Sequence, residues 1–136
     1  MSKHEEHERA LIRAFILPAR QERYLELLVR PERRKDILSE LPHFKHLDMR
    51  WAVPVPHGRP KTILEVLEMK GSPKHCHALS EDSDLDGKEL QLLKALEEIH
   101  GRGIGTFPSC IAGKLAYFED EDQRWILERA AAPNLR

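Results

Sequence analysis

The sequence predicts an α+β fold, with N-terminal helices packed on a small, mostly antiparallel sheet and a crossover helix covering the sheet's other apolar surface. Three patterns lead to this prediction. Apolar residues recur at helical spacing over 5–41 and again over 87–100, and the last quarter combines β-favouring residues with tight-turn glycines. Separate runs of helices and strands are typical of the α+β class.

The chain has 136 residues, enough for one domain to bury a core without a metal ion or a disulfide. We therefore predict a single domain over 1–136, with 1–8 as a flexible or helical extension. The 22 basic and 23 acidic side chains give a formal net charge of -1. This balance argues against a nucleic-acid or membrane-surface binder, because such proteins rely on a summed basic field.

Prolines divide the N-terminal part into three predicted helices. The first runs over 5–17 and ends before Pro18, because the residue before proline disfavours helical dihedrals. The second begins at Pro18 and the third runs from Pro31 to about Leu41, since proline suits the first turn of a helix. The apolar side chains expected to face the core are Leu11, Ile12, Phe15, Ile16, Tyr24, Leu25, Leu28, Val29, Ile37, Leu38 and Leu41.

The middle of the chain is rich in proline. We expect residues 43–59 to form a covering loop, in which the extended segment 53–56 pairs at most as an edge strand. A short buried helix is predicted over 62–70, and Gly71 ends it.

Four predicted strands form the sheet. They lie near 75–80, 105–111, 115–119 and 123–129, and the last three make a compact antiparallel meander. Alternation along the first strand puts Cys76 and His77 on opposite faces.

The crossover helix is predicted over 87–100. Its start is indicated by Asp86 and Glu89, which have the spacing of a capping box. Glycines from Gly101 onward end it and lead into the meander.

Several motif matches are incomplete. Residues 82–87 resemble the front of a calcium loop, but Leu93 stands where such a loop needs a bidentate glutamate. The glycines of 101–105 follow a helix instead of a strand, and 113–114 lacks the flanking residues of a phosphate loop. We interpret both glycine segments as turns.

Histidines at 43–48 and 75–77 have the spacing of metal ligands. A structural zinc site needs four ligands, and the sequence identifies no second pair to complete either set. The prediction is therefore that the protein has no metal ion, no cofactor and no catalytic residue.

Small polar residues placed where predicted strands end define the candidate ligand-binding site. This site consists of Cys76, Ser80, Asp86, Ser109 and Cys110. Because no catalytic signature is complete, the leading hypothesis is a non-enzymatic module that binds a small molecule or a protein partner, or that has a regulatory role.

Two alternatives stay open. In the first, Cys110 is a nucleophilic or redox thiol with His75 or His77 as its base, although a free cysteine in a strand is more often a small buried hydrophobe. In the second, the N-terminal helices bind phosphate or nucleic acid, although interleaved glutamates favour a salt-bridged surface. The basic residues concerned are Arg20, Arg23, Arg33, Arg34 and Lys35.

Several segments together resemble a family of small uncharacterised bacterial proteins. The resemblance spans roughly Arg9 to Arg129. The segments that carry it are 15–28, 76–80, 85–87, 105–106, 109–111 and 113–119. It implies no activity, because the family has no known function.

The N-terminus lacks the apolar core of a signal peptide, and no apolar run approaches the length of a membrane span. We expect a cytoplasmic protein without membrane contact, in which both cysteines are thiols.

Overall fold

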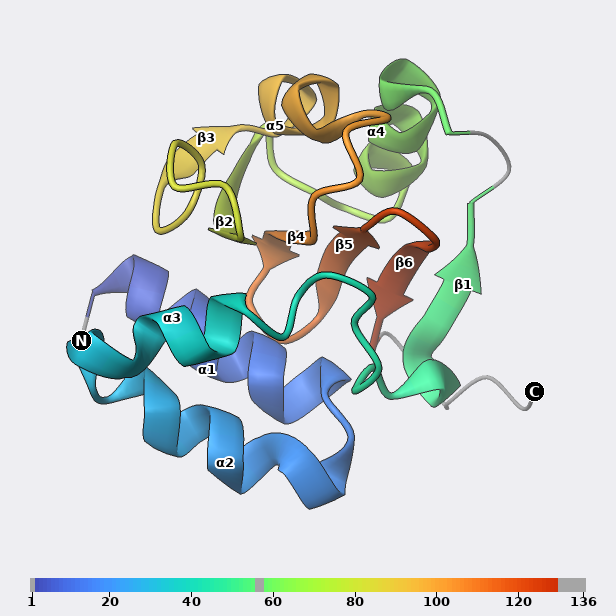
Figure 1. Ribbon diagram of the computed structural model, residues 1–136. Helices are drawn as coiled ribbons and strands as arrows, with labels where there is room; N and C mark the ends of the chain where they lie inside the picture. Colours follow the sequence, from blue (N-terminus) through green and yellow to red (C-terminus); the bar gives the residue numbers. More distant parts are fainter. Residues whose placement is uncertain (1, 56–57, 130–136) are drawn as a thin grey trace.

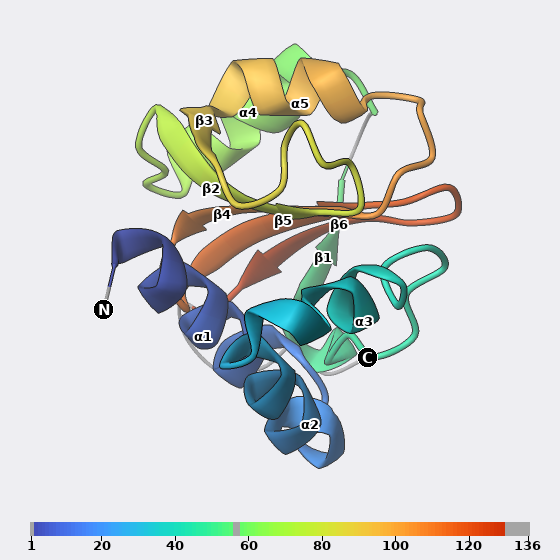
Figure 2. The same ribbon diagram turned by 60° about the vertical axis from the view of Figure 1, so that its left-hand side comes forward.

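The computed structural model describes residues 2–55 and 58–129, which form three layers (Figure 1, Figure 2). An antiparallel sheet is the middle layer, with α1, α2 and α3 on one face and α4 and α5 on the other. The helices are α1 (Lys3–Phe15), α2 (Pro18–Leu28), α3 (Arg34–Leu38), α4 (Pro60–Met69) and α5 (Leu92–Ile99), with 3-10 turns η1 (Pro31–Arg33) and η2 (Met49–Trp51). The predicted α+β fold class is confirmed.

The sheet has the strand order β1-β6-β5-β4-β2-β3, and each pair of neighbours is antiparallel. Its strands are β1 (Ala52–Pro54), β2 (His75–Ser80), β3 (Glu89–Gln91), β4 (Thr106–Ile111), β5 (Leu115–Glu119) and β6 (Arg124–Glu128). The meander of β4, β5 and β6 has the predicted bounds to within a residue or two at each end. A register shift between Ser109 and Ile111 marks a bulge in β4.

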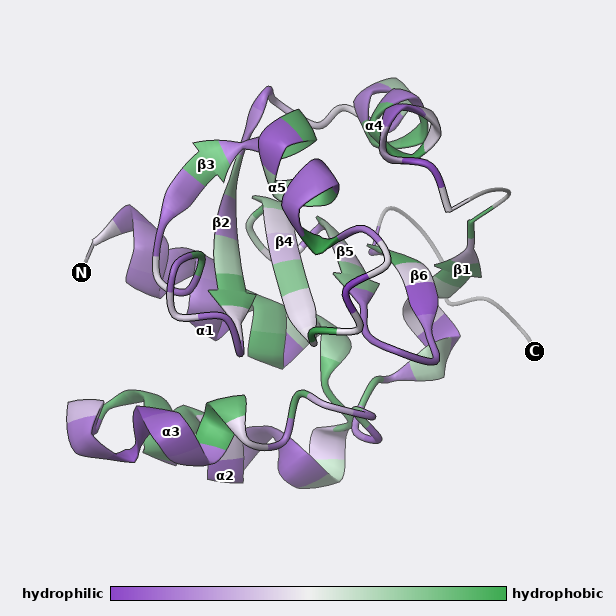
Figure 3. Ribbon diagram, turned by 45° about the horizontal axis from the view of Figure 1, so that its top comes forward, coloured by the Kyte–Doolittle hydropathy of each residue, from purple (hydrophilic) through white to green (hydrophobic). Residues whose placement is uncertain are grey.

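Alternation along the strands gives each face of the sheet its own apolar core. On β2, Cys76 and Ala78 belong to the core under α4 and α5, whereas Leu79 belongs to the core under α1 to α3. On β4, Phe107 belongs to the core under α1 to α3, and Cys110 belongs to the core under α4 and α5. The central strands are accordingly apolar between the two helical layers (Figure 3).

The structure has three N-terminal helices, as predicted, but the third begins as the 3-10 turn η1 and continues as α3 only to Leu38, and the predicted buried stripe has one error. Helix α1 begins at Lys3, so the described part of 1–8 is mostly helical. Val29 is 58% exposed, and Leu27 at 5% is buried instead. The reason is that α2 ends at Leu28, which leaves Val29 in the turn before Pro31, outside the helical repeat.

The prediction of a helix over 87–100 is wrong at its start. Gly87 has a positive φ of 75°, which does not continue a helix, and Glu89–Gln91 pairs with β2 as strand β3. The predicted capping box is absent, because the Asp86 carboxylate accepts hydrogen bonds from Ser80 N and Arg34. Helix α5 therefore begins only at Leu92.

The proline-rich middle forms loops with one edge strand. Strand β1 pairs with β6, as the expectation of at most an edge pairing allows. In α4, Ile63 and Leu67 are buried, but Met69 is 87% exposed. Of the helices in the described ranges, none has the length and apolarity needed to span a bilayer.

Candidate functional site

The five residues of the predicted site lie in different places. Cys76 and Cys110 face the core under α4 and α5, and alternation puts Ser80 on the same side of the sheet. Ser109 faces the opposite layer, where its Oγ lies 2.7 Å from His7 Nδ1 of α1. Asp86 lies in the loop between β2 and β3. The structure does not bring these five side chains into one pocket.

Ser80 and Asp86 are engaged in holding the end of β2. The Ser80 hydroxyl lies 2.7 Å from Thr106 Oγ1 and accepts a hydrogen bond from Asp82 N at 3.0 Å. Asp86 Oδ1 accepts from Ser80 N, also at 3.0 Å. Both side chains are therefore used in hydrogen bonds that hold the β2–β3 loop at the end of β2.

The two thiols are buried in an apolar environment. Burial raises the pKa of Cys110 to about 11, and burial also raises the pKa of Cys76. Cys110 Sγ contacts Pro108 O at 3.8 Å and the Ser72 side chain, and no histidine hydrogen-bonds to it in the described part of the chain. This environment favours the thiol over the nucleophilic thiolate.

We expect Cys110 to resist alkylation in the folded protein. Iodoacetamide should modify neither cysteine measurably near neutral pH, and modification should rise only as the pH approaches 11, the pKa of Cys110. Mass spectrometry of the folded and the denatured protein measures this difference. Rapid modification of the folded protein at neutral pH would contradict the buried position.

Histidines gather instead on the other face of the sheet, beneath the N-terminal end of α1. His4 Nδ1 lies 3.2 Å from His77 Nδ1 on β2, and the His7 ring stacks on the His77 ring with centroids 4.1 Å apart. His4 Nε2 lies 3.0 Å from Glu8 Oε2, and His77 Nε2 lies 3.3 Å from Glu89 Oε2. We call His4, His7 and His77 the histidine cluster.

An ion-pair network adjoins the histidine cluster. Arg34 Nη1 donates to Glu8 Oε1 at 3.0 Å, and Arg34 Nε donates to Asp86 Oδ2 at 2.7 Å. Glu8 is 6% exposed, so its charge depends on these partners. The network connects α1, α3 and the β2–β3 loop.

Burial and neighbouring charges set the protonation of this region. Burial lowers the pKa of His7 and of His77, and the neighbouring histidines lower both further. Burial raises the pKa of the Glu8 carboxyl, but hydrogen bonds from His4 and Arg34 outweigh this effect and hold it below its ordinary value. Neutral imidazoles at His7 and His77 and an ionised carboxylate at Glu8 are therefore favoured at neutral pH.

A hollow of about 630 Å³ opens beside the histidine cluster. Its polar lining comes from α1 and its N-cap and from α3: Ser2, His4, Glu5, Glu8, Arg9 and Arg34. Its apolar lining comes from the end of α2 and the start of η1: Leu28, Val29 and Pro31. A hollow with both polar and apolar lining suits a small amphipathic molecule.

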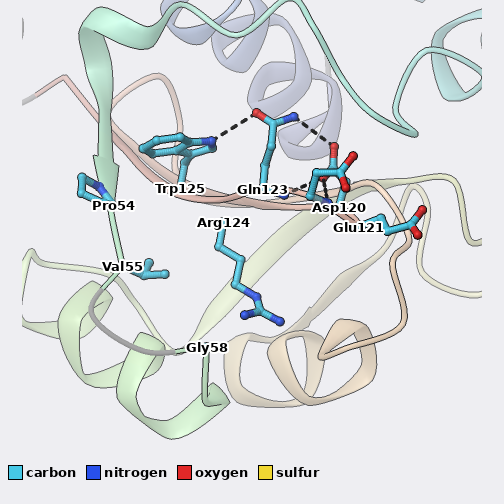
Figure 4. A pocket seen from close by; sticks show the side chains of 9 residues that line it. Pro54, Val55, Gly58, Asp120, Glu121, Gln123, Arg124 and Trp125 are labelled. Atoms are coloured by element: carbon cyan, nitrogen blue, oxygen red, sulfur yellow. Dashed lines mark hydrogen bonds between the residues drawn. The ribbon is translucent and has the colours of Figure 1, made fainter. Parts of the chain in front are cut away.

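A second hollow, of about 410 Å³, lies at the β5–β6 turn (Figure 4). Three of its polar side chains already bond to one another: Trp125 Nε1 donates to Gln123, whose amide donates to Asp120. Asp120 also accepts from Asp122 N and Gln123 N, so it stabilises the turn. Arg124 points away from this row (Figure 4).

The basic residues of the N-terminal helices are divided between two environments. Arg20, Arg23 and Arg33 border a hollow of about 310 Å³ together with acidic residues, and Arg33 pairs with Asp36. Arg34 is turned inward to Glu8 and Asp86.

The sequence interpretation did not identify the N-terminal part of the histidine cluster. One signal was present: Glu8 lies three, four and seven residues before Leu11, Ile12 and Phe15, on the same buried stripe of α1, and His4 is one turn earlier. Polar residues that extend an apolar stripe indicate a buried polar contact.

Across the two ranges that the structure describes, no three His, Cys, Asp or Glu side chains are arranged to hold a metal ion. Comparison with protein-family models, with curated proteins and with solved structures gives no match to this chain.

Proposed function

We propose that this protein is a non-enzymatic module that binds a small aliphatic carboxylate in the hollow beside the histidine cluster. The observation that carries the proposal is the position of Arg9. Its side chain lines the hollow, and it has no hydrogen-bond or ion-pair partner among the described residues. The neighbouring Arg34, in contrast, is fully engaged by Glu8 and Asp86.

The chemistry of the lining supports this class of ligand. A guanidinium binds a carboxylate through two parallel hydrogen bonds, which gives both affinity and orientation. Val29 is 58% exposed and lines the hollow with Leu28 and Pro31, so an aliphatic chain would cover apolar surface there. Glu5, which also lines the hollow, accepts a hydrogen bond from the Ser2 hydroxyl.

The buried thiols weaken the enzymatic alternative. Cys110 is 3% exposed, and burial raises the pKa of its thiol. Among the described residues, no histidine hydrogen-bonds to it as a general base would. The two cysteines are free, which agrees with the proposed cytoplasmic location. Membership of the bacterial family that the sequence resembles is part of the same proposal.

Titration of the isotope-labelled protein with hexanoate tests the proposal by amide chemical-shift changes. We expect saturable shifts at residues 2–9 and 28–34, and we expect Arg9→Gln to weaken binding about tenfold or more, because a charge-assisted hydrogen bond contributes about 1.5–3 kcal/mol. Arg13→Gln is the matched control, since Arg13 is an exposed arginine one turn along the same helix. Absence of saturable shifts, or equal affinities of the Arg9 variant and the wild type, would reject the carboxylate site.

A further inference from the structure

The hollow of about 310 Å³ that Arg20, Arg23 and Arg33 border plays no part in the proposed carboxylate site. Its lining comes from α2, from η1 and α3, and from the loop that follows α3. The charged side chains in this lining are those of Arg20, Arg23, Arg33, Asp36 and Glu40. Three guanidinium groups therefore share the hollow with two carboxylates.

Ion pairing decides which of these charges are free. Arg33 and Asp36 pair with each other, so their charges offset one another. The side chains of Arg20, Arg23 and Glu40 have no hydrogen-bond or ion-pair partner among residues 2–55 and 58–129. The salt bridges that the sequence led us to expect at the two arginines are thus not formed there. Two free guanidinium groups and one free carboxylate leave the hollow with an excess of positive charge.

The spacing of the two free arginines suits one shared ligand. Arg20 and Arg23 are three residues apart in α2, so they lie on the same face of the helix and their Cβ atoms are about 5–6 Å apart. A guanidinium group binds phosphate oxygens through paired hydrogen bonds. A phosphate group has enough oxygens for two guanidinium groups to bind it at once, whereas a carboxylate has only two oxygens to share between them.

Two aromatic residues complete the polar lining. The Tyr24 hydroxyl lies 2.8 Å from His46 Nδ1. Burial raises the pKa of Tyr24 to about 12, so its hydroxyl keeps its proton at neutral pH and adds no negative charge. When this hydroxyl donates to Nδ1, the neutral His46 ring carries its own proton at Nε2, which has no hydrogen-bond partner in the described part of the chain. His46 then offers a third donor to a ligand.

A neighbouring hollow of about 270 Å³ provides space beyond the phosphate group. It shares Ser39, Glu40 and His46 with the first hollow. It also includes Lys45, whose ammonium group has no ion-pair partner among the described residues. A hydroxyl and an ammonium group in this lining favour a polar, hydroxylated substituent.

We propose that Arg20, Arg23 and His46 bind the dianionic phosphate group of a small phosphate monoester, whose alcohol part extends toward Lys45. Glu40 opposes the anion by its like charge and so limits the affinity. This second ligand site goes beyond the proposed carboxylate binding, because its hollow shares no residue with the one that Arg9 lines.

Titration of the isotope-labelled full chain with β-glycerophosphate tests this proposal by amide chemical-shift changes. We expect saturable shifts at residues 20–27 and 39–46, and no shifts with glycerol. Added sodium chloride should weaken the binding, because it screens exposed charges. Inorganic phosphate should bind more weakly than the ester, since it leaves the neighbouring hollow empty. Equal affinities would overturn the ester and assign the site to free phosphate.

Variants of the charged residues test the geometry of the site. Arg20→Gln and Arg23→Gln should each weaken binding about tenfold, because each removes hydrogen bonds to a charged group. Arg30→Gln is the control, since Arg30 is an exposed arginine outside the hollow. Glu40→Gln should instead tighten binding about twofold, because it removes a like charge beside the anion. The three substituted side chains of the site are exposed, so the fold does not depend on them.

Absence of saturable shifts with β-glycerophosphate would overturn the site. Equal affinities of the wild type and both arginine variants, or weaker binding by the Glu40 variant, would overturn it as well. Arg9→Gln should leave phosphate binding unchanged, and Arg20→Gln should leave hexanoate binding unchanged. The failure of one site is therefore distinguishable from the failure of the other.

Discussion

Replacing Arg34 with methionine is expected to lower the free energy of unfolding by about 3 kcal/mol, the lower end of the range for breaking a buried ion pair. The substitution leaves the carboxylates of Glu8 and Asp86, whose side chains are 7% and 10% exposed, without their guanidinium partner. The lower end applies because the Arg34 side chain is itself 29% exposed. Urea denaturation measures the difference through a shifted midpoint at constant slope.

Two further variants provide a control for this prediction and test its physical cause. Lys35→Met removes an exposed charge from the next residue of α3 and should change the stability by less than about 0.5 kcal/mol. If charge compensation is the cause, Glu8→Gln combined with Arg34→Met should be less destabilising than the sum of the two single changes. Additive effects, or a stable Arg34 variant, would show that the network contributes little.

Replacing Gly105 with alanine is expected to destabilise the fold by about 3 kcal/mol, the upper end of the usual effect of overpacking. A Cβ at this position would lie 2.5 Å from the carbonyl oxygen of Leu41 and 2.7 Å from its carbonyl carbon. Both are backbone atoms, so no side-chain rotation relieves the clash. Gly105 is also fixed on its other side by Glu81, whose Oε2 accepts from Gly105 N at 2.6 Å.

Gly101→Ala is the informative comparison. Gly101 has a positive φ of 69° and nothing within 4 Å of an added Cβ, so only backbone strain of about 1–2 kcal/mol opposes the change. Amide chemical shifts should move near Leu41 in the Gly105 variant and stay in place there in the Gly101 variant. A Gly105 variant as stable as the wild type would mean that the Leu41 segment is not held against β4.

Local patterns predicted most of the fold. The meander, the helix that begins at Pro18 and the 3-10 turn that begins at Pro31 follow from turn glycines, prolines and apolar periodicity, which act over a few residues. The start of α5 was mispredicted because Asp86 has a stronger distant partner in Arg34, 52 residues earlier in the chain. A cap is predictable only where no tertiary partner competes for the capping side chain.

The candidate site was less predictable, because its contacts join distant parts of the chain. His7 contacts Ser109, which lies 102 residues later in the chain, and His4 contacts His77, which lies 73 residues later. The sequence identified Ser109, Asp86 and His77 as polar residues of interest, but pairing them with the first turns of α1 required knowing which face of the sheet that helix covers. The five predicted residues were grouped by nearness to strand ends, whereas alternation assigns them to opposite faces.

The two outer strands of the sheet are poorly suited to pair with a second copy of this chain. Strand β1 ends at Pro54, which has no N–H to offer, and strand β3 is only three residues long, with Glu89 and Gln91 exposed. Neither outer strand offers a long row of free backbone groups to which a second sheet could add. The edges of the folded sheet therefore disfavour edge-to-edge pairing between copies of this chain.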